Sequence, residues 1–63
     1  MPEDDCRRAL KLWRDYDRVR HELIARLYNG RDNPEHIQKL LDENDDIRRQ
    51  ALELTELVLR TRE

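Results

Sequence analysis

Near the middle of this 63-residue chain, a helix-ending signal and a helix-starting signal stand within seven residues, between positions 29 and 35. Gly30 is the residue type that best accepts the left-handed conformation with which many helices close. Asn33 can cap the first turn of a following helix, and Pro34 suits the first position of that helix. The sequence therefore predicts an all-α fold, an antiparallel two-helix hairpin with helices at about residues 3–29 and 34–61 and a turn at residues 30–33.

The apolar residues follow a regular period, although the composition alone would suit a disordered chain. Charged residues make up 44% of the sequence and aromatic residues only 5%, a balance that lacks enough apolar surface to fold unless that surface is gathered on one side. Spacings of alternately three and four residues predict a coiled-coil-like seam on each helix. The first seam comprises Cys6, Ala9, Trp13, Tyr16, Arg20, Leu23 and Leu27, and the second comprises Ile37, Leu40, Asn44, Ile47, Ala51, Leu54 and Val58.

Each seam contains one polar member, and the two fall opposite each other. Residues that face each other across a hairpin turning near residue 32 have numbers that add to about 64, so Arg20 faces Asn44. We therefore expect a buried or half-buried polar layer. Its role is either structural, fixing register and oligomeric state, or ligand binding, with the arginine guanidinium gripping a carboxylate or phosphate.

More apolar residues flank the two seams than two helices can cover, which favours association of chains. Burying a leucine stabilises by about 1.5 to 3 kcal/mol, and cores this small usually need a disulfide, a metal or a partner. The single cysteine rules out an intrachain disulfide. We expect a two-fold homodimer that forms a four-helix bundle, with a heteromeric protein partner and a higher oligomer as alternatives.

The end of the hairpin opposite the turn gathers the apolar residues that best suit an interface. Trp13 is the expected anchor there, because enclosed aromatic side chains often dominate the energy of an interface. Ordinary packing within one hairpin is the alternative role for the same residue. The predicted interface comprises Leu10, Leu12, Trp13, Leu52, Leu57 and Leu59.

The net charge of -2 hides a division between a basic first helix and an acidic second one. Residues 6–31 carry eight basic and three acidic side chains, whereas residues 32–63 carry five basic and nine acidic ones. Four basic residues recur at spacings of four and three and form one outward stripe: Arg7, Lys11, Arg14 and Arg18. This stripe is either a solvated face that complements the acidic helix of a mate or, doubled in a dimer, an anion-binding surface for structured RNA.

The sequence shows no pattern that indicates catalysis, a cofactor or a metal. His21 and His36 lack the spacing of a metal-binding pair, and Cys6 lies on the seam, where packing as a small apolar residue is expected. The longest apolar runs fall far below the roughly 20 residues of a spanning helix, and no signal-type segment is seen at the N-terminus. We therefore expect a non-catalytic cytoplasmic interaction or regulatory module, with RNA binding as the alternative.

Overall fold

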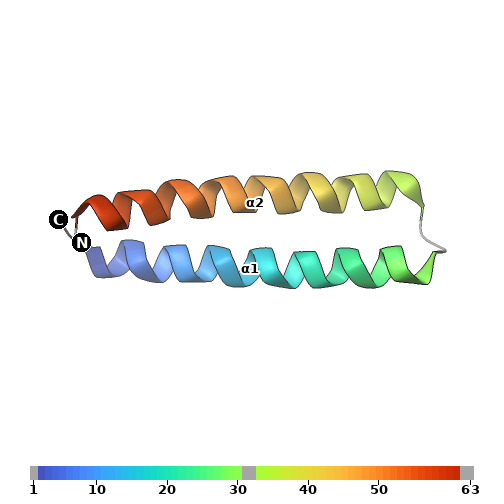
Figure 1. The fold of residues 1–63 in the computed structure, drawn as a ribbon, viewed down its shortest axis with the longest axis horizontal. Coiled ribbons are helices and arrows are strands. Elements are labelled where there is room, and N and C mark those ends of the chain that lie inside the picture. Colours follow the sequence, from blue (N-terminus) through green and yellow to red (C-terminus); the bar gives the residue numbers. More distant parts are fainter. Residues whose placement is uncertain (1, 31–32, 62–63) are drawn as a thin grey trace.

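The computed structural model describes residues 2–30 and 33–61, and it consists of two long helices joined at one end (Figure 1). Helix α1 spans Pro2–Asn29 and helix α2 spans Pro34–Thr61, 28 residues each. They lie side by side in opposite directions and form a rod of 47 × 14 × 14 Å. The predicted all-α antiparallel hairpin is confirmed. Within the described ranges, neither helix is long and apolar enough to cross a membrane.

The signals around the turn act as expected. Gly30 has a positive φ of 68°, and its backbone N–H donates to the carbonyl of Arg26 at 3.3 Å. At the start of α2, the side-chain oxygen of Asn33 accepts a hydrogen bond of 2.9 Å from the backbone N–H of Glu35. These contacts satisfy backbone groups that a helix end leaves without an intrahelical partner. Residues 31 and 32 of the predicted turn lie outside the described residues.

The buried residues lie along the contact between the helices. Val19, Leu23 and Leu40 form the central cluster, and the half-buried Ile37 and Ile47 pack against it. All seven residues of the predicted seam on α2 are buried or half-buried. The seam of the second helix is therefore confirmed.

The seam of α1 is shifted by one residue over part of its length. Val19 is 1% exposed, whereas Leu27 is 55% exposed and Arg20 is also exposed. Burying a valine stabilises the fold, whereas burying a guanidinium without a partner is costly. The predicted seam therefore needs correction at these two positions, because Arg20 and Leu27 lie outside it and Val19 lies within it.

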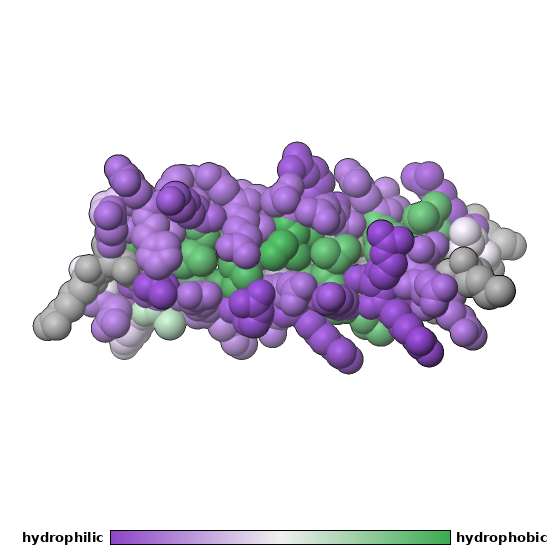
Figure 2. Space-filling model, turned by 180° about the vertical axis from the view of Figure 1, so that it is seen from behind, coloured by the Kyte–Doolittle hydropathy of each residue, from purple (hydrophilic) through white to green (hydrophobic). Residues whose placement is uncertain are grey.

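Hydrophilic side chains cover most of the remaining surface. Seen from behind the view of Figure 1, hydrophobic side chains form a narrow band along the rod between hydrophilic borders (Figure 2). Ion pairs form within each helix, for example Arg26 with Glu22 at 3.3 Å and Arg49 with Asp46. The hydrogen bond and the charge of Asp46 raise the pKa of Arg49. Such exposed pairs contribute little to stability.

Candidate functional site

Trp13 links the two helices near the end opposite the turn. Its indole Nε1 donates a hydrogen bond of 2.9 Å to the hydroxyl oxygen of Thr55. Its ring also meets the ring of Tyr16 edge-on, with centroids 5.9 Å apart and planes at 88°, a geometry that aromatic pairs favour. Trp13 is half-buried, so one part of the indole holds the hairpin together and another part borders the surface.

Two hollows flank this end of the hairpin. The first has a volume of about 200 Å³, and its lining is almost entirely apolar: Cys6, Ala9, Leu10, Trp13, Thr55, Val58 and Leu59. The second has a volume of about 320 Å³ and a more polar lining: Arg8, Leu12, Gln50, Glu53, Leu54 and Leu57. Residues two apart on a helix project in widely different directions, so Leu10 and Leu12 belong to different sides of the hairpin.

The predicted interface is therefore divided between two sides, and the expectation of one continuous patch needs correction. The structure brings together Leu10, Trp13 and Leu59 around the first hollow. Leu52 lies seven residues before Leu59, which is two helical turns, so it shares that side. Leu12 and Leu57 line the second hollow instead.

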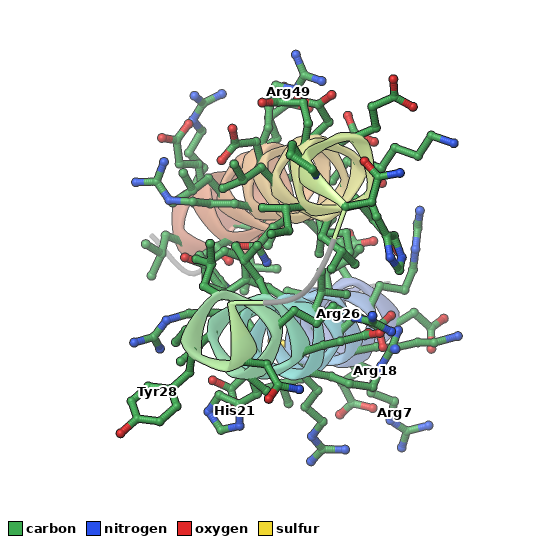
Figure 3. The ribbon with its side chains drawn as sticks, turned by 90° about the vertical axis from the view of Figure 1, so that its right-hand side faces the viewer. Arg7, Arg18, His21, Arg26, Tyr28 and Arg49 are labelled. Atoms are coloured by element: carbon green, nitrogen blue, oxygen red, sulfur yellow. The ribbon has the colours of Figure 1, made fainter. Side chains whose placement is uncertain are left out.

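The first hollow is one end of a surface that runs along the whole rod, here called the lateral face. Continuing from Leu10 and Leu59 at spacings of three and four residues keeps to the same side of each helix. In α1 the lateral face comprises Leu10, Trp13, Asp17, Arg20, Ile24 and Leu27, and in α2 it comprises Leu41, Asp45, Arg48, Leu52, Thr55 and Leu59. In the view along the rod, Tyr28, four residues after Ile24, points to this side, and Arg26 lies on the other (Figure 3).

The lateral face exposes most of the large apolar side chains that the hairpin leaves in contact with solvent. Leu10 and Leu59 are 55% and 57% exposed, and Ile24 is 48% exposed. Among the described residues, the large exposed apolar side chains are Leu10, Ile24, Leu27, Tyr28, Leu41, Leu52, Leu57 and Leu59. All of these except Leu57 lie on or beside the lateral face. Exposed apolar side chains concentrated in this way are a common feature of interaction surfaces, so the lateral face is the candidate functional site.

The predicted polar layer contains Asn44 but not Arg20. Asn44 is buried, and its side-chain N–H donates a hydrogen bond of 2.9 Å to the backbone carbonyl of Tyr16. The side chain of Arg20 is 52% exposed and lies 3.9 Å from the carboxylate of Asp17. The expectation that these residues share one buried or half-buried layer is therefore wrong for the arginine, whose side chain lies outside the contact between the helices.

The predicted basic stripe lies on the outer surface of α1. Arg7, Lys11, Arg14 and Arg18 are all exposed. Figure 3 shows Arg7 and Arg18 pointing away from α2, on the side of α1 opposite the seam. The stripe is therefore separate from both hollows, and its four side chains reach solvent together.

The remaining candidates are scattered along the rod. His21 is exposed and lies 3.6 Å from Asp17, His36 is exposed near the start of α2, and the half-buried Cys6 borders the first hollow. Within residues 2–30 and 33–61, no three His, Cys, Asp or Glu side chains gather in a way that could hold a metal ion.

The hydrogen bond between Trp13 and Thr55 was not anticipated from the sequence. Thr55 directly follows the seam residue Leu54. A hydroxyl beside a seam, at the level of an indole on the other helix, is the signal that could have identified it, because a buried Trp N–H usually finds an acceptor. The contact fixes the relative level of the two helices at the open end.

Comparisons with protein-family models, with curated proteins and with solved structures found no match.

Proposed function

We propose that this protein is a small, non-catalytic interaction or regulatory module that acts in the cytoplasm as a homodimeric four-helix bundle. The observation that carries this proposal is the lateral face, where large apolar side chains on both helices are left open to water by a single hairpin. A cytoplasmic location is supported by the single cysteine, since a chain without disulfides suits a reducing compartment.

The free energy available on the lateral face favours pairing. Covering a leucine stabilises by about 1.5 to 3 kcal/mol when the side chain goes from fully exposed to buried. The leucines here are already partly covered, so each would contribute a fraction of that value. Several such side chains together still outweigh a surface ion pair, which contributes under about 1 kcal/mol. A rod only 14 Å across cannot enclose these side chains by itself.

Sedimentation equilibrium of the native chain over a wide concentration range tests the dimer directly. We expect a two-chain mass at micromolar concentrations and a thermal midpoint that rises with concentration, because dissociation accompanies unfolding in a linked dimer. A cooperatively melting, fully helical species of single-chain mass at these concentrations would refute the proposal.

An interaction role also requires a surface that remains available in the dimer. The second hollow lies on the side of the hairpin away from the lateral face, and Leu57 within it is 44% exposed. Its lining combines apolar side chains with Arg8 and Glu53, a mixture typical of protein-binding surfaces. We propose it as the contact for a protein partner. Affinity capture with the Leu57→Asp variant as the matched control tests this, and equal capture by both chains would contradict it.

RNA binding is a second candidate function, favoured by the exposure of the basic stripe on the outer surface of α1. Arg7, Lys11, Arg14 and Arg18 are all exposed and none of them belongs to the lateral face, so they stay accessible when that face is covered. Phosphate contacts predict that the logarithm of the binding constant falls linearly with the logarithm of salt concentration. Capture from lysate with and without nuclease separates the two functions, and no binding to a structured RNA at low salt would dismiss this one.

A further inference from the structure

The lateral face carries the same pattern on both helices. An apolar residue is followed four positions later by aspartate, three positions later by arginine, and four positions later by a second apolar residue. In α1 these are Trp13, Asp17, Arg20 and Ile24, and in α2 they are Leu41, Asp45, Arg48 and Leu52. The charged residues are exposed. Each helix thus has a charged pair with an apolar residue of the lateral face on either side of it.

The two charged pairs lie at the same level of the rod. The hydrogen bonds from Trp13 to Thr55 and from Asn44 to Tyr16 indicate which residues of α1 and α2 lie at the same level of the rod. The register midway between these contacts places Asp17 beside Arg48, and Arg20 beside Asp45. Each hairpin therefore presents two neighbouring charged layers, and each layer holds one acidic and one basic side chain.

We propose that the lateral face docks on the lateral face of a second copy of this chain, with the two turns at opposite ends and with the Asp–Arg layers setting the register. This inference rests on the proposed homodimer and specifies its contact surface. The argument for a second copy is self-complementary charge. A two-fold interface brings the same surface of both chains together, so a surface that pairs with itself must carry both charges in matching positions.

A single two-fold axis satisfies both helices at once. The axis lies in the plane of contact and runs across the rod, at the level between Asp17 and Arg20. It places Asp17 of each copy against Arg20 of the other. At the same level on α2 it sets Asp45 against Arg48. The same axis also brings three pairs of apolar residues together, whereas Leu59 faces Pro34 at the end of the contact. The pairs are Trp13 with Ile24, Leu10 with Leu27, and Leu41 with Leu52.

The apolar pairs select the direction of the second copy. Turning the second hairpin about the long axis instead, with both turns at one end, also sets opposite charges against each other. That arrangement faces Leu27 with the amide of Gln38 and brings two tryptophans to one level. With the turns at opposite ends, Leu27 meets Leu10, and each Trp13 shares its level with an isoleucine and two leucines. Large side chains then alternate with smaller ones, as close packing requires.

The charged layers determine how the two hairpins are aligned along the rod more than how tightly they bind. These side chains are exposed in the single hairpin, and the cost of removing them from water on docking offsets much of the attraction between opposite charges. A slip of one helical turn, however, would bury charged side chains against leucines, which is costly. Opposing like charges at an interface is likewise unfavourable. The layers thus exclude the slipped registers that a uniformly apolar stripe would allow.

A pair of complementary charge variants tests the contact surface. The acidic variant combines Arg20→Glu with Arg48→Glu, and the basic variant combines Asp17→Lys with Asp45→Lys. Each variant alone sets like charges against each other, and we expect its dimer to weaken roughly tenfold or more. Mixed in equal amounts, the two restore opposite charges in every layer. We expect a heterodimer by native mass spectrometry and recovery of helical circular dichroism where either variant alone has lost it.

Matched controls carry the same changes in charge on outward positions. They are Arg49→Glu with Arg60→Glu, and Asp42→Lys with Glu56→Lys, all exposed positions outside the lateral face. We expect both controls to dimerise like the native chain. If the lateral-face variants also dimerise alone as the native chain does, or if their mixture recovers neither mass nor helicity, the inference fails. A native chain that is itself monomeric would instead overturn the proposed function.

Spin labels test the direction of the second copy. A label at Asp4→Cys, in a Cys6→Ala background, lies near the open end of each hairpin. With the turns at opposite ends, the two labels are expected about 45 Å apart, given a rise of about 1.5 Å per residue. Labels within about 25 Å would require the turns to lie at the same end and would overturn the proposed arrangement.

Discussion

Asn44 donates a hydrogen bond of 2.9 Å from its side-chain amide to the backbone carbonyl of Tyr16, across the contact between the helices. It is the one polar residue among those buried in the described part of the chain. The carbonyl of Tyr16 lies within α1, where such groups already accept an intrahelical hydrogen bond. The Tyr16 carbonyl therefore accepts a second hydrogen bond. The Asn44 amide gains a partner, and the hydrogen bond within α1 is kept.

Replacing Asn44 with alanine is expected to lower the free energy of unfolding by about 1 to 2 kcal/mol, because a hydrogen bond and packed volume are both lost. Asn44→Leu is expected to be more stable than Asn44→Ala and to lose the single oligomeric state, as coiled coils do when a buried asparagine is removed. Urea unfolding and sedimentation of the two variants measure these effects. A single, unchanged species for Asn44→Leu would show that the amide does not select the assembly.

The contact between Trp13 and Thr55 predicts a measurable coupling between two distant parts of the chain. Trp13→Phe and Thr55→Val each remove one partner of the hydrogen bond. Their combined effect on the free energy of unfolding is expected to be smaller than the sum of the single effects by roughly 0.5 to 1.5 kcal/mol. A double-mutant cycle by urea denaturation gives this difference. Strict additivity would mean that the hydrogen bond contributes nothing.

The positive φ of Gly30 predicts a backbone cost for other residue types. Gly30→Ala is expected to lower the free energy of unfolding by roughly 1 kcal/mol, because a side chain disfavours the left-handed conformation. Open space surrounds the position, with nothing within 4 Å of an added Cβ, so the loss reflects strain alone. Gly30→Asn is the matched variant and is expected to lose less, since asparagine visits this conformation more readily. Thermal melting of both variants at equal concentration checks the order.

Two leucines on α2 with nearly equal exposure distinguish the two sides of the hairpin. Leu52 on the lateral face is 39% exposed, and Leu57 beside the second hollow is 44% exposed. Leu52→Gln is expected to weaken the dimer by roughly tenfold, because about 1 kcal/mol or more of apolar burial is lost, whereas Leu57→Gln leaves it unchanged. Dissociation constants from sedimentation decide between them. Equal losses would show that the contact is not confined to the lateral face.

The fold was predictable from a few local signals. Gly30, Asn33 and Pro34 define the end of one helix and the start of the next, and each acts through its own backbone or side-chain chemistry. On α2 the apolar period admits one register, so the buried residues from Ile37 to Val58 follow from spacing alone.

The register of α1 could not be settled by spacing. Two sets of α1 residues follow the same alternating spacing of three and four, and both contain Ala9, Tyr16 and Leu23. One set includes Val19 and the other includes Arg20. Only contact with α2 decides between them, and it favours the valine. The division of the predicted interface has the same origin, because assigning Leu10 and Leu12 to different sides requires knowing which face of α1 packs.

The rod is 47 Å long and the two helices are linked at one end only. Contacts near the connecting segment close a short loop, whereas contacts at the far end hold together segments that are separated by nearly the entire chain, and the entropy needed to join them is larger. Backbone amide exchange should therefore be slowest near Val19 and Leu40 and progressively faster toward Pro2 and Thr61, so that the helices separate first at the end where Trp13 bonds Thr55.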